Sequence, residues 1–210
     1  MKSNEIKNEL HITVNHTGKM KGMASLSTLC QINPNCKRYA QIPGSICQKC
    51  YAMRQTKCYK SMQPCLARNT ELLTTSVLPT EKLPLLNNCY FRFEAFGDLV
   101  NETQLINYFN ICKKNPDTHF ALWTKNPHIV KNVVETVKKP KNLQIILSSL
   151  FINTEVNIEK MPYIDKVFTV YDQATIDKEG IEINCGAKNC LKCHKCYKAN
   201  TTNIINEKLK

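Results

Sequence analysis

The chain has 210 residues, of which 42% are hydrophobic, and a formal net charge of +12. Length and composition are ordinary for a globular protein, so we expect a single domain over residues 1–210. Residues 1–20 lack the apolar core of a signal peptide and no apolar run is long enough to span a bilayer, so we expect a cytoplasmic protein without membrane contact.

The positive charge indicates nucleic acid as a partner only weakly. The lysines are spread along the chain, and the densest run, at 137–141, is short. Two iron–sulfur clusters on eight thiolates would add about −8 from the ligands and about +4 from the cluster cores. Part of the excess positive charge would then balance bound clusters.

The N-terminal part, about 18–80, is rich in cysteine. The chain holds twelve cysteines, which a reducing cytosol keeps as thiols, so metal binding is favoured over a disulfide framework. Pro43 and Gly44 predict a turn just before a C-x-x-C pair, and two earlier cysteines can complete a set of four ligands. The predicted metal ligands of this first group are Cys30, Cys36, Cys47 and Cys50.

The remaining cysteines are weaker candidates. Cys58 and Cys65 flank a helix expected to begin near Pro64, and each could be a ligand, a redox thiol or a packing residue, with packing slightly favoured. Cys89 and Cys112 lie alone, and we expect both to be small buried apolar side chains.

The middle of the chain, 89–172, alternates strand-like and helix-like patterns. Asn101 can cap a helix after the first strand, and Asn126 with Pro127 opens a second helix. Such alternation pairs strands in parallel through right-handed crossovers. It predicts an α/β fold, a partial (β/α) barrel with mostly parallel strands between cysteine-rich N- and C-terminal segments. The expected strands are Cys89–Phe96, His119–Lys125, Leu143–Ser149 and Lys166–Asp172.

Polar residues gather at the carboxyl ends of these strands, where sheets of this kind carry their chemistry. Each has an ordinary alternative: Asp98 can cap a helix, Lys125 can be solvated and Ser148 can end its strand. Glu94 is more informative because it sits in an apolar run, where an unpaired carboxylate is costly. We expect its partner to be Arg92, Lys125 or the ammonium group of a ligand.

The segment 185–197 reads CGAKNCLKCHKCY, with four cysteines and a histidine. Its embedded C-x-x-C-H resembles a haem attachment signal, but that attachment is made outside the cytoplasm and leaves two thiols unexplained. Zinc sites usually use two separated knuckles, whereas C-x-x-C-x-x-C suits the corners of a cubane, so we prefer a [4Fe–4S] cluster and keep zinc as the alternative. His194 would then be solvated or lie beside a ligand. The predicted ligands of this second group are Cys185, Cys190, Cys193 and Cys196.

Several motifs together resemble a family of phage and prophage proteins known as gene product 88. They are NHTGKMKGMASLSTLC, CQKCYAMR, CLARNTEL, FRFEAFGDL, HFALWTKNP and the final cysteine cluster, over about 18–197. The family is largely uncharacterised, so this resemblance implies a phage origin and little about function.

The chain is more distantly similar to radical S-adenosylmethionine (SAM) enzymes. Their partial barrel follows a cysteine loop that holds three irons of a [4Fe–4S] cluster, and SAM binds the fourth iron and is cleaved reductively. The resemblance implies that Tyr51 accompanies the last cysteine of this loop and that Glu94 or Asp98 contacts the amino group of SAM. Pro43 stands where that family has its first cysteine. If all four thiols of the first group bind one cluster, no iron is open to SAM.

The leading hypothesis is a cytoplasmic iron–sulfur protein, a radical-SAM-like redox enzyme of unknown substrate, with a small molecule or an electron donor as partner. One alternative is a zinc-stabilised basic module that binds nucleic acid or a host protein without catalysis. Another is a protein that only relays electrons. The candidate catalytic residues are Glu94, Asp98 and Lys125, and the candidate cofactor-binding residues are Tyr51, Glu94 and Ser148.

Overall fold

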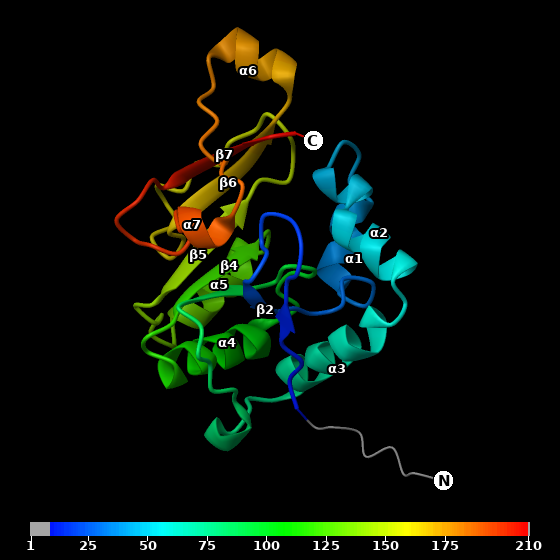
Figure 1. Ribbon diagram of the computed structural model, residues 1–210, viewed down its shortest axis with the longest axis vertical. Helices are drawn as coiled ribbons and strands as arrows, with labels where there is room; N and C mark the ends of the chain where they lie inside the picture. The colour runs from blue at the N-terminus through cyan, green and yellow to red at the C-terminus, as the bar shows by residue number, and fades with distance from the viewer. Residues whose placement is uncertain (1–8, 210) are drawn as a thin grey trace.

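The structure, a computed structural model, describes residues 9–209 and is built on one seven-stranded sheet (Figure 1). The strands lie side by side in chain order; β1 pairs antiparallel with β2, and every other neighbouring pair is parallel. β1 and β7 form the two edges, so the sheet is open, and the predicted α/β partial barrel is confirmed. The strands are β1 Thr13–Val14, β2 Ala24–Leu26, β3 Tyr90–Phe93, β4 His119–Thr124, β5 Leu143–Ser148, β6 Lys166–Tyr171 and β7 Ile204–Lys208.

Helices fill most of the connections between parallel strands. The Asn101 side chain accepts a hydrogen bond from the Gln104 N–H at 3.0 Å and caps α4, while Pro127 occupies the first turn of α5, as predicted. α3 begins two residues before Pro64. The α-helices are α1 Pro34–Ala40, α2 Tyr51–Cys58, α3 Met62–Thr75, α4 Glu102–Lys114, α5 Pro127–Val134, α6 Gln173–Glu179 and α7 Cys190–Cys193, and the 3-10 helices are η1 Ile46–Lys49 and η2 Thr80–Lys82.

Within residues 9–209, every helix is too short or too polar to cross a bilayer.

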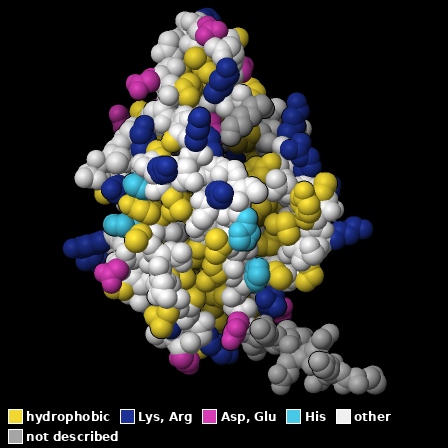
Figure 2. Space-filling model, in the orientation of Figure 1, with side chains coloured by type: hydrophobic (Ala, Val, Ile, Leu, Met, Phe, Trp, Pro, Cys, Tyr) yellow, Lys and Arg dark blue, Asp and Glu magenta, His cyan; other side chains and the backbone are white. Residues whose placement is uncertain are grey.

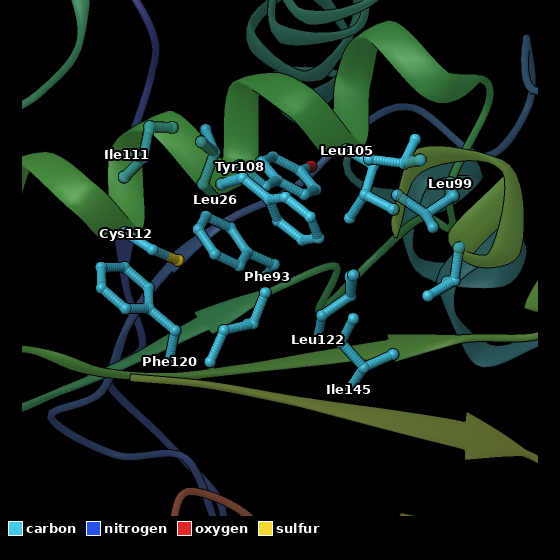
Figure 3. Close-up of a cluster of buried hydrophobic side chains, with 14 of the residues drawn as sticks. Leu26, Phe93, Leu99, Leu105, Tyr108, Ile111, Cys112, Phe120, Leu122 and Ile145 are labelled. Atoms are coloured by element: carbon cyan, nitrogen blue, oxygen red, sulfur yellow. The ribbon is translucent and has the colours of Figure 1, made fainter. Parts of the chain in front are cut away.

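The main hydrophobic core lies between one face of the sheet and helices α3, α4 and α5. Figure 3 shows its centre, where the Phe93 ring stacks on Tyr108 of α4 with ring centroids 4.1 Å apart and on Phe120 of β4 at 5.2 Å. Cys112 is fully buried here, as predicted. The prediction that Cys89 is buried is wrong: it directly precedes β3, at the amino end of that strand, and is exposed.

The opposite face of the sheet supports a smaller cluster. Because side chains alternate along a strand, Ala121 and Ile146 point away from the main core and pack with Met23 and Tyr197. Leu191 of α7 packs against this cluster, so the C-terminal cysteine segment covers the face that the larger helices leave open. The candidate site lies on this side.

A candidate site lined by two cysteine groups

A cavity of about 1050 Å³ opens at the carboxyl ends of β3 to β6. Its walls include every candidate residue predicted from the sequence. Besides the eight predicted ligands, these are Tyr51, Glu94, Asp98, Lys125 and Ser148. The structure thus brings all of them to one place, while the roles assigned to them stay predictions.

The first group, Cys30, Cys36, Cys47 and Cys50, comes from the connection between β2 and β3. It spans the residues after β2, helix α1, helix η1 and the start of α2. The Asn33 side chain caps α1 by accepting from the Cys36 N–H at 3.3 Å, and the Ile46 N–H donates to the Leu150 carbonyl at 2.9 Å. The Ile46 bond and a bond from the Asn33 side-chain amide to the Asp98 carbonyl, at 2.8 Å, fasten the cysteine-bearing turns to the loops that follow β5 and β3. Cys58 and Cys65 lie outside the cavity lining.

The second group, Cys185, Cys190, Cys193 and Cys196, is held against the turn between β1 and β2. The Lys19 carbonyl accepts from the Cys190 N–H at 2.8 Å, and the Lys19 ammonium donates to the Cys185 carbonyl at 3.0 Å and to Glu207 at 2.6 Å. The ring of His194 stacks on Tyr90 with centroids 4.6 Å apart, so His194 is a packing residue of this segment.

Thiol chemistry in both groups is set by burial. Burial raises the pKa of Cys30 to about 11 and that of Cys196 to about 12, and neighbouring thiols of the same group add to both shifts. Burial also raises the pKa of Cys190, while the positive charges of Arg92 and Lys19 oppose that rise. The Cys30, Cys190 and Cys196 thiols are therefore protonated at neutral pH, and a bound metal would displace their protons.

Each group supplies four sulfur donors, the ligand type of both zinc sites and iron–sulfur clusters. Among residues 9–209, no three His, Cys, Asp or Glu side chains are grouped closely enough to hold one metal ion. A tetrahedral zinc ion with bonds of about 2.3 Å would need thiolates about 3.8 Å apart. A cubane places its ligands at separate corners, farther apart, and needs soft sulfur donors such as the four in each group.

Glu94 lies directly after β3 in a left-handed conformation, with φ of 56°, and is 2% exposed. Its carboxylate accepts hydrogen bonds from the Tyr108 hydroxyl at 2.5 Å, the Gln104 amide at 2.6 Å and the Thr28 N–H at 3.2 Å. Burial raises its pKa to about 8. The expectation of Arg92 or Lys125 as partner is wrong, because neutral donors from α4 and the residues after β2 surround the carboxylate. A ligand ammonium as partner stays a prediction.

Asp98 is also fully engaged with the protein. It accepts from the Thr124 hydroxyl at 2.6 Å and from the Lys125 N–H at 3.0 Å. It therefore fixes the end of β4, and Asn101 rather than Asp98 caps α4. The Lys125 ammonium in turn donates to the Ser148 hydroxyl at 3.0 Å.

Arg92 also lines the cavity, although sequence reasoning considered it only as a partner of Glu94. Its guanidinium lies 4.0 Å from the centre of the Trp123 ring. The signal was present in the alternation along β3, where Tyr90 and Arg92 must face away from the core that holds Phe91 and Phe93.

Fold and site together define an α/β protein with an open, mostly parallel sheet and one cavity walled by two groups of thiols. The family model described as Gene product 88 matches residues 2–208. The chain belongs to this family, as its motifs indicated. No curated protein and no solved structure matches the chain. None of these comparisons links it to radical SAM enzymes.

Proposed function

We propose that this protein is an iron–sulfur redox protein that holds a [4Fe–4S] cluster with each cysteine group and acts on a small molecule in the cavity between them. The observation that carries the proposal is that eight cysteines from opposite ends of the chain line one cavity. Thiols gathered only for packing would have no reason to meet at the carboxyl ends of the strands, where α/β proteins bind ligands.

The protein surroundings suit this use. Lys19 and Arg92 place positive charge beside the second group, which stabilises the anionic thiolates that a cluster requires. When bound, such clusters supply one-electron transfer. The chain itself supplies the enclosing walls, the polar strand ends that can orient a substrate, and the fixed positions of the thiols.

Paired cysteine substitutions test the proposal. We expect anaerobically purified protein to show visible charge-transfer absorption that dithionite bleaches. Cys47→Ser with Cys50→Ser should remove about half of the bleachable absorption, Cys193→Ser with Cys196→Ser the other half, and the fourfold variant all of it. Cys58→Ser with Cys89→Ser, which changes two exposed cysteines, is the matched control and should remove none. Full absorption in either paired variant would contradict a cluster at that group.

A radical-SAM-like enzyme is a second candidate, and one feature of the first group favours it. Cys30 is 1% exposed and its thiol contacts the Thr56 hydroxyl at 3.8 Å, whereas the other three cysteines are only half-buried. Three ligands would leave one iron of the cluster open to SAM. The accessible ligands would be Cys36, Cys47 and Cys50.

Cys30→Ser separates the two candidates. If three cysteines hold the cluster, the variant keeps its iron, and both it and the unmodified protein form 5′-deoxyadenosine when incubated anaerobically with SAM and dithionite. If all four cysteines hold it, the variant loses iron and neither protein forms 5′-deoxyadenosine. In the second outcome, the remaining function for the protein would be electron transfer to a substrate without the use of SAM.

A further inference from the structure

We infer that the cavity binds a small anion, a molecule carrying a carboxylate or phosphate group, through Arg92 and Lys125. This inference rests on the proposed function for the site, and it adds the chemical class of the ligand. The evidence is the set of charged side chains in the cavity wall, together with their hydrogen bonds and their unused hydrogen-bond donors.

Arg92 is the first of the two cations. Its Nη1 atom lies 3.3 Å from the Met20 sulfur, which is a weak acceptor, and its Nε–H is buried without a hydrogen-bond partner. Within residues 9–209 the ion pairs are Lys19–Glu207 and Lys139–Asp165, so no described carboxylate neutralises Arg92. A guanidinium held inside a cavity with unused donors is costly unless an anion binds there.

Lys125 is the second cation, at the carboxyl end of β4. Its ammonium donates to the Ser148 hydroxyl, a neutral acceptor, and its charge opposes the rise that burial causes in the pKa of the Asp98 carboxyl. The Asp98 carboxylate already accepts from the Thr124 hydroxyl and the Lys125 N–H. The lysine and serine therefore offer a cationic and a hydroxyl group together at the strand tips.

The acidic side chains that line the cavity all have hydrogen-bond or ion-pair partners within the protein. Glu94 accepts from Tyr108 and Gln104, Asp98 closes the end of β4, and Glu207 pairs with Lys19. No described carboxylate of the wall is therefore left to pair with the Arg92 guanidinium, whose charge acts on the Cys190 and Cys196 thiols.

The shape of the site also suits an anion. The planar fork of an arginine binds carboxylate and phosphate groups through two parallel hydrogen bonds. The Trp123 ring lies against the guanidinium and helps to hold it in place. The cavity, at about 1050 Å³, is at the upper end of the range of about 300–1,000 Å³ for small-molecule sites.

Titration calorimetry of the iron-loaded protein tests the inference, with inorganic phosphate and malonate as separate probes at constant ionic strength. We expect at least one probe to bind, which also distinguishes a phosphate from a carboxylate ligand. Arg92→Gln and Lys125→Met should each weaken that binding about tenfold or more, as expected for lost hydrogen bonds to a charged group. Arg92→Lys should recover part of the affinity. Lys131→Gln, an exposed change on α5, is the matched charge control and should leave binding unchanged.

Iron content is measured on every variant to keep the two proposals apart. Absence of binding of both probes to iron-loaded protein, or unchanged affinity in Arg92→Gln, would overturn the anion site. A second result would also overturn the anion site: Arg92→Gln loses iron, and neither probe binds to the unmodified protein. Arg92 would then serve only the second cysteine group. A protein that binds phosphate or malonate through Arg92 but never holds iron would refute the proposed function and retain the anion site.

Discussion

Glu94 is the most unusual ionisable group of the site, because a carboxyl with a pKa of about 8 is buried among neutral donors. A glutamate in the unfolded chain has a pKa near 4.5. Between these two values the folded protein keeps a proton that the unfolded chain releases. The free energy of unfolding should therefore fall as the pH rises through this window, by up to about 1.4 kcal/mol per pH unit.

Glu94→Gln should remove this part of the pH dependence, because glutamine keeps the shape of the side chain but does not titrate. Urea unfolding at pH 5, 6 and 7 measures it, and the exposed substitution Glu135→Gln serves as control. Parallel pH profiles for the unmodified protein and Glu94→Gln would show that Glu94 does not hold a proton in this window.

Gly97 is required by close packing rather than by its backbone angles. A Cβ atom at this position would overlap the Glu94 carboxylate and the Thr28 hydroxyl and would come within 2.8 Å of the Thr28 carbonyl oxygen. Gly97→Ala should therefore destabilise the protein by about 1–3 kcal/mol, as expected for overpacking.

Gly186 supplies the matched control for this change, because a Cβ there would meet no atom within 4 Å. Urea midpoints of the two alanine variants give the comparison. Equal midpoints for Gly97→Ala and the unmodified protein would mean that the turn after β3 accommodates the added methyl group without loss of stability.

Among the elements, α1 matters most because it carries Cys36 into the cavity. The Asn33 side chain caps this helix and also donates to the Asp98 carbonyl at 2.8 Å, while itself fully buried. Asn33→Ala should lower the free energy of unfolding by about 1–2 kcal/mol and should also reduce the iron bound by the first cysteine group.

Asn101→Ala is the matched control for the loss of a helix cap, because it removes the cap of α4, a helix without a predicted ligand. It should lower stability by a similar amount while leaving the iron content intact. Equal iron loss in both variants would attribute the effect to general destabilisation, and would contradict a specific role for α1.

The elements with regular patterns were predictable from the sequence, and the irregular ones were not. The alternating and helical apolar patterns of 89–172, together with the caps at Asn101 and Pro127, indicated β3 to β6 and helices α4 and α5. The cysteine-bearing turns around α1, η1 and α7 have few apolar residues and depend on hydrogen bonds to distant loops. Such bonds, for example from Ile46 to Leu150, leave no local signal.

The same distinction explains which site contacts were missed. The sequence indicated that polar residues would meet at the strand ends, because the carboxyl ends of parallel strands share one edge. It did not indicate that Glu94 turns through a left-handed conformation to meet Tyr108 and Gln104 of α4. Partners of a single carboxylate depend on backbone angles that a residue pattern does not specify.

At the scale of the whole molecule, the cavity is assembled from both ends of the chain. Lys19, from the turn between β1 and β2, holds the Cys185 carbonyl and pairs with Glu207 of β7. Lys19→Met should lower stability by about 1 kcal/mol or less, since this ion pair is partly exposed, and should weaken iron binding by the second cysteine group.

Iron titration of Lys19→Met under anaerobic conditions, compared with the exposed variant Lys57→Met, measures this effect. Unchanged iron binding in Lys19→Met would show that the C-terminal segment holds its position without the N-terminal turn.

The distribution of surface charge bears on the alternative of a nucleic-acid module. Figure 2 shows Lys and Arg side chains scattered over the visible face rather than gathered into one basic patch. Arg92 and Lys125 line the cavity instead. They suit a small anion better than a polyanionic backbone.

The central claim is that the two cysteine groups hold two iron–sulfur clusters. The most direct measurement is an anaerobic assay of iron, acid-labile sulfide and zinc in the full-length protein after reconstitution. The account predicts about eight irons and about eight sulfides per chain, with little zinc. A colourless protein that retains stoichiometric zinc and no sulfide would contradict it.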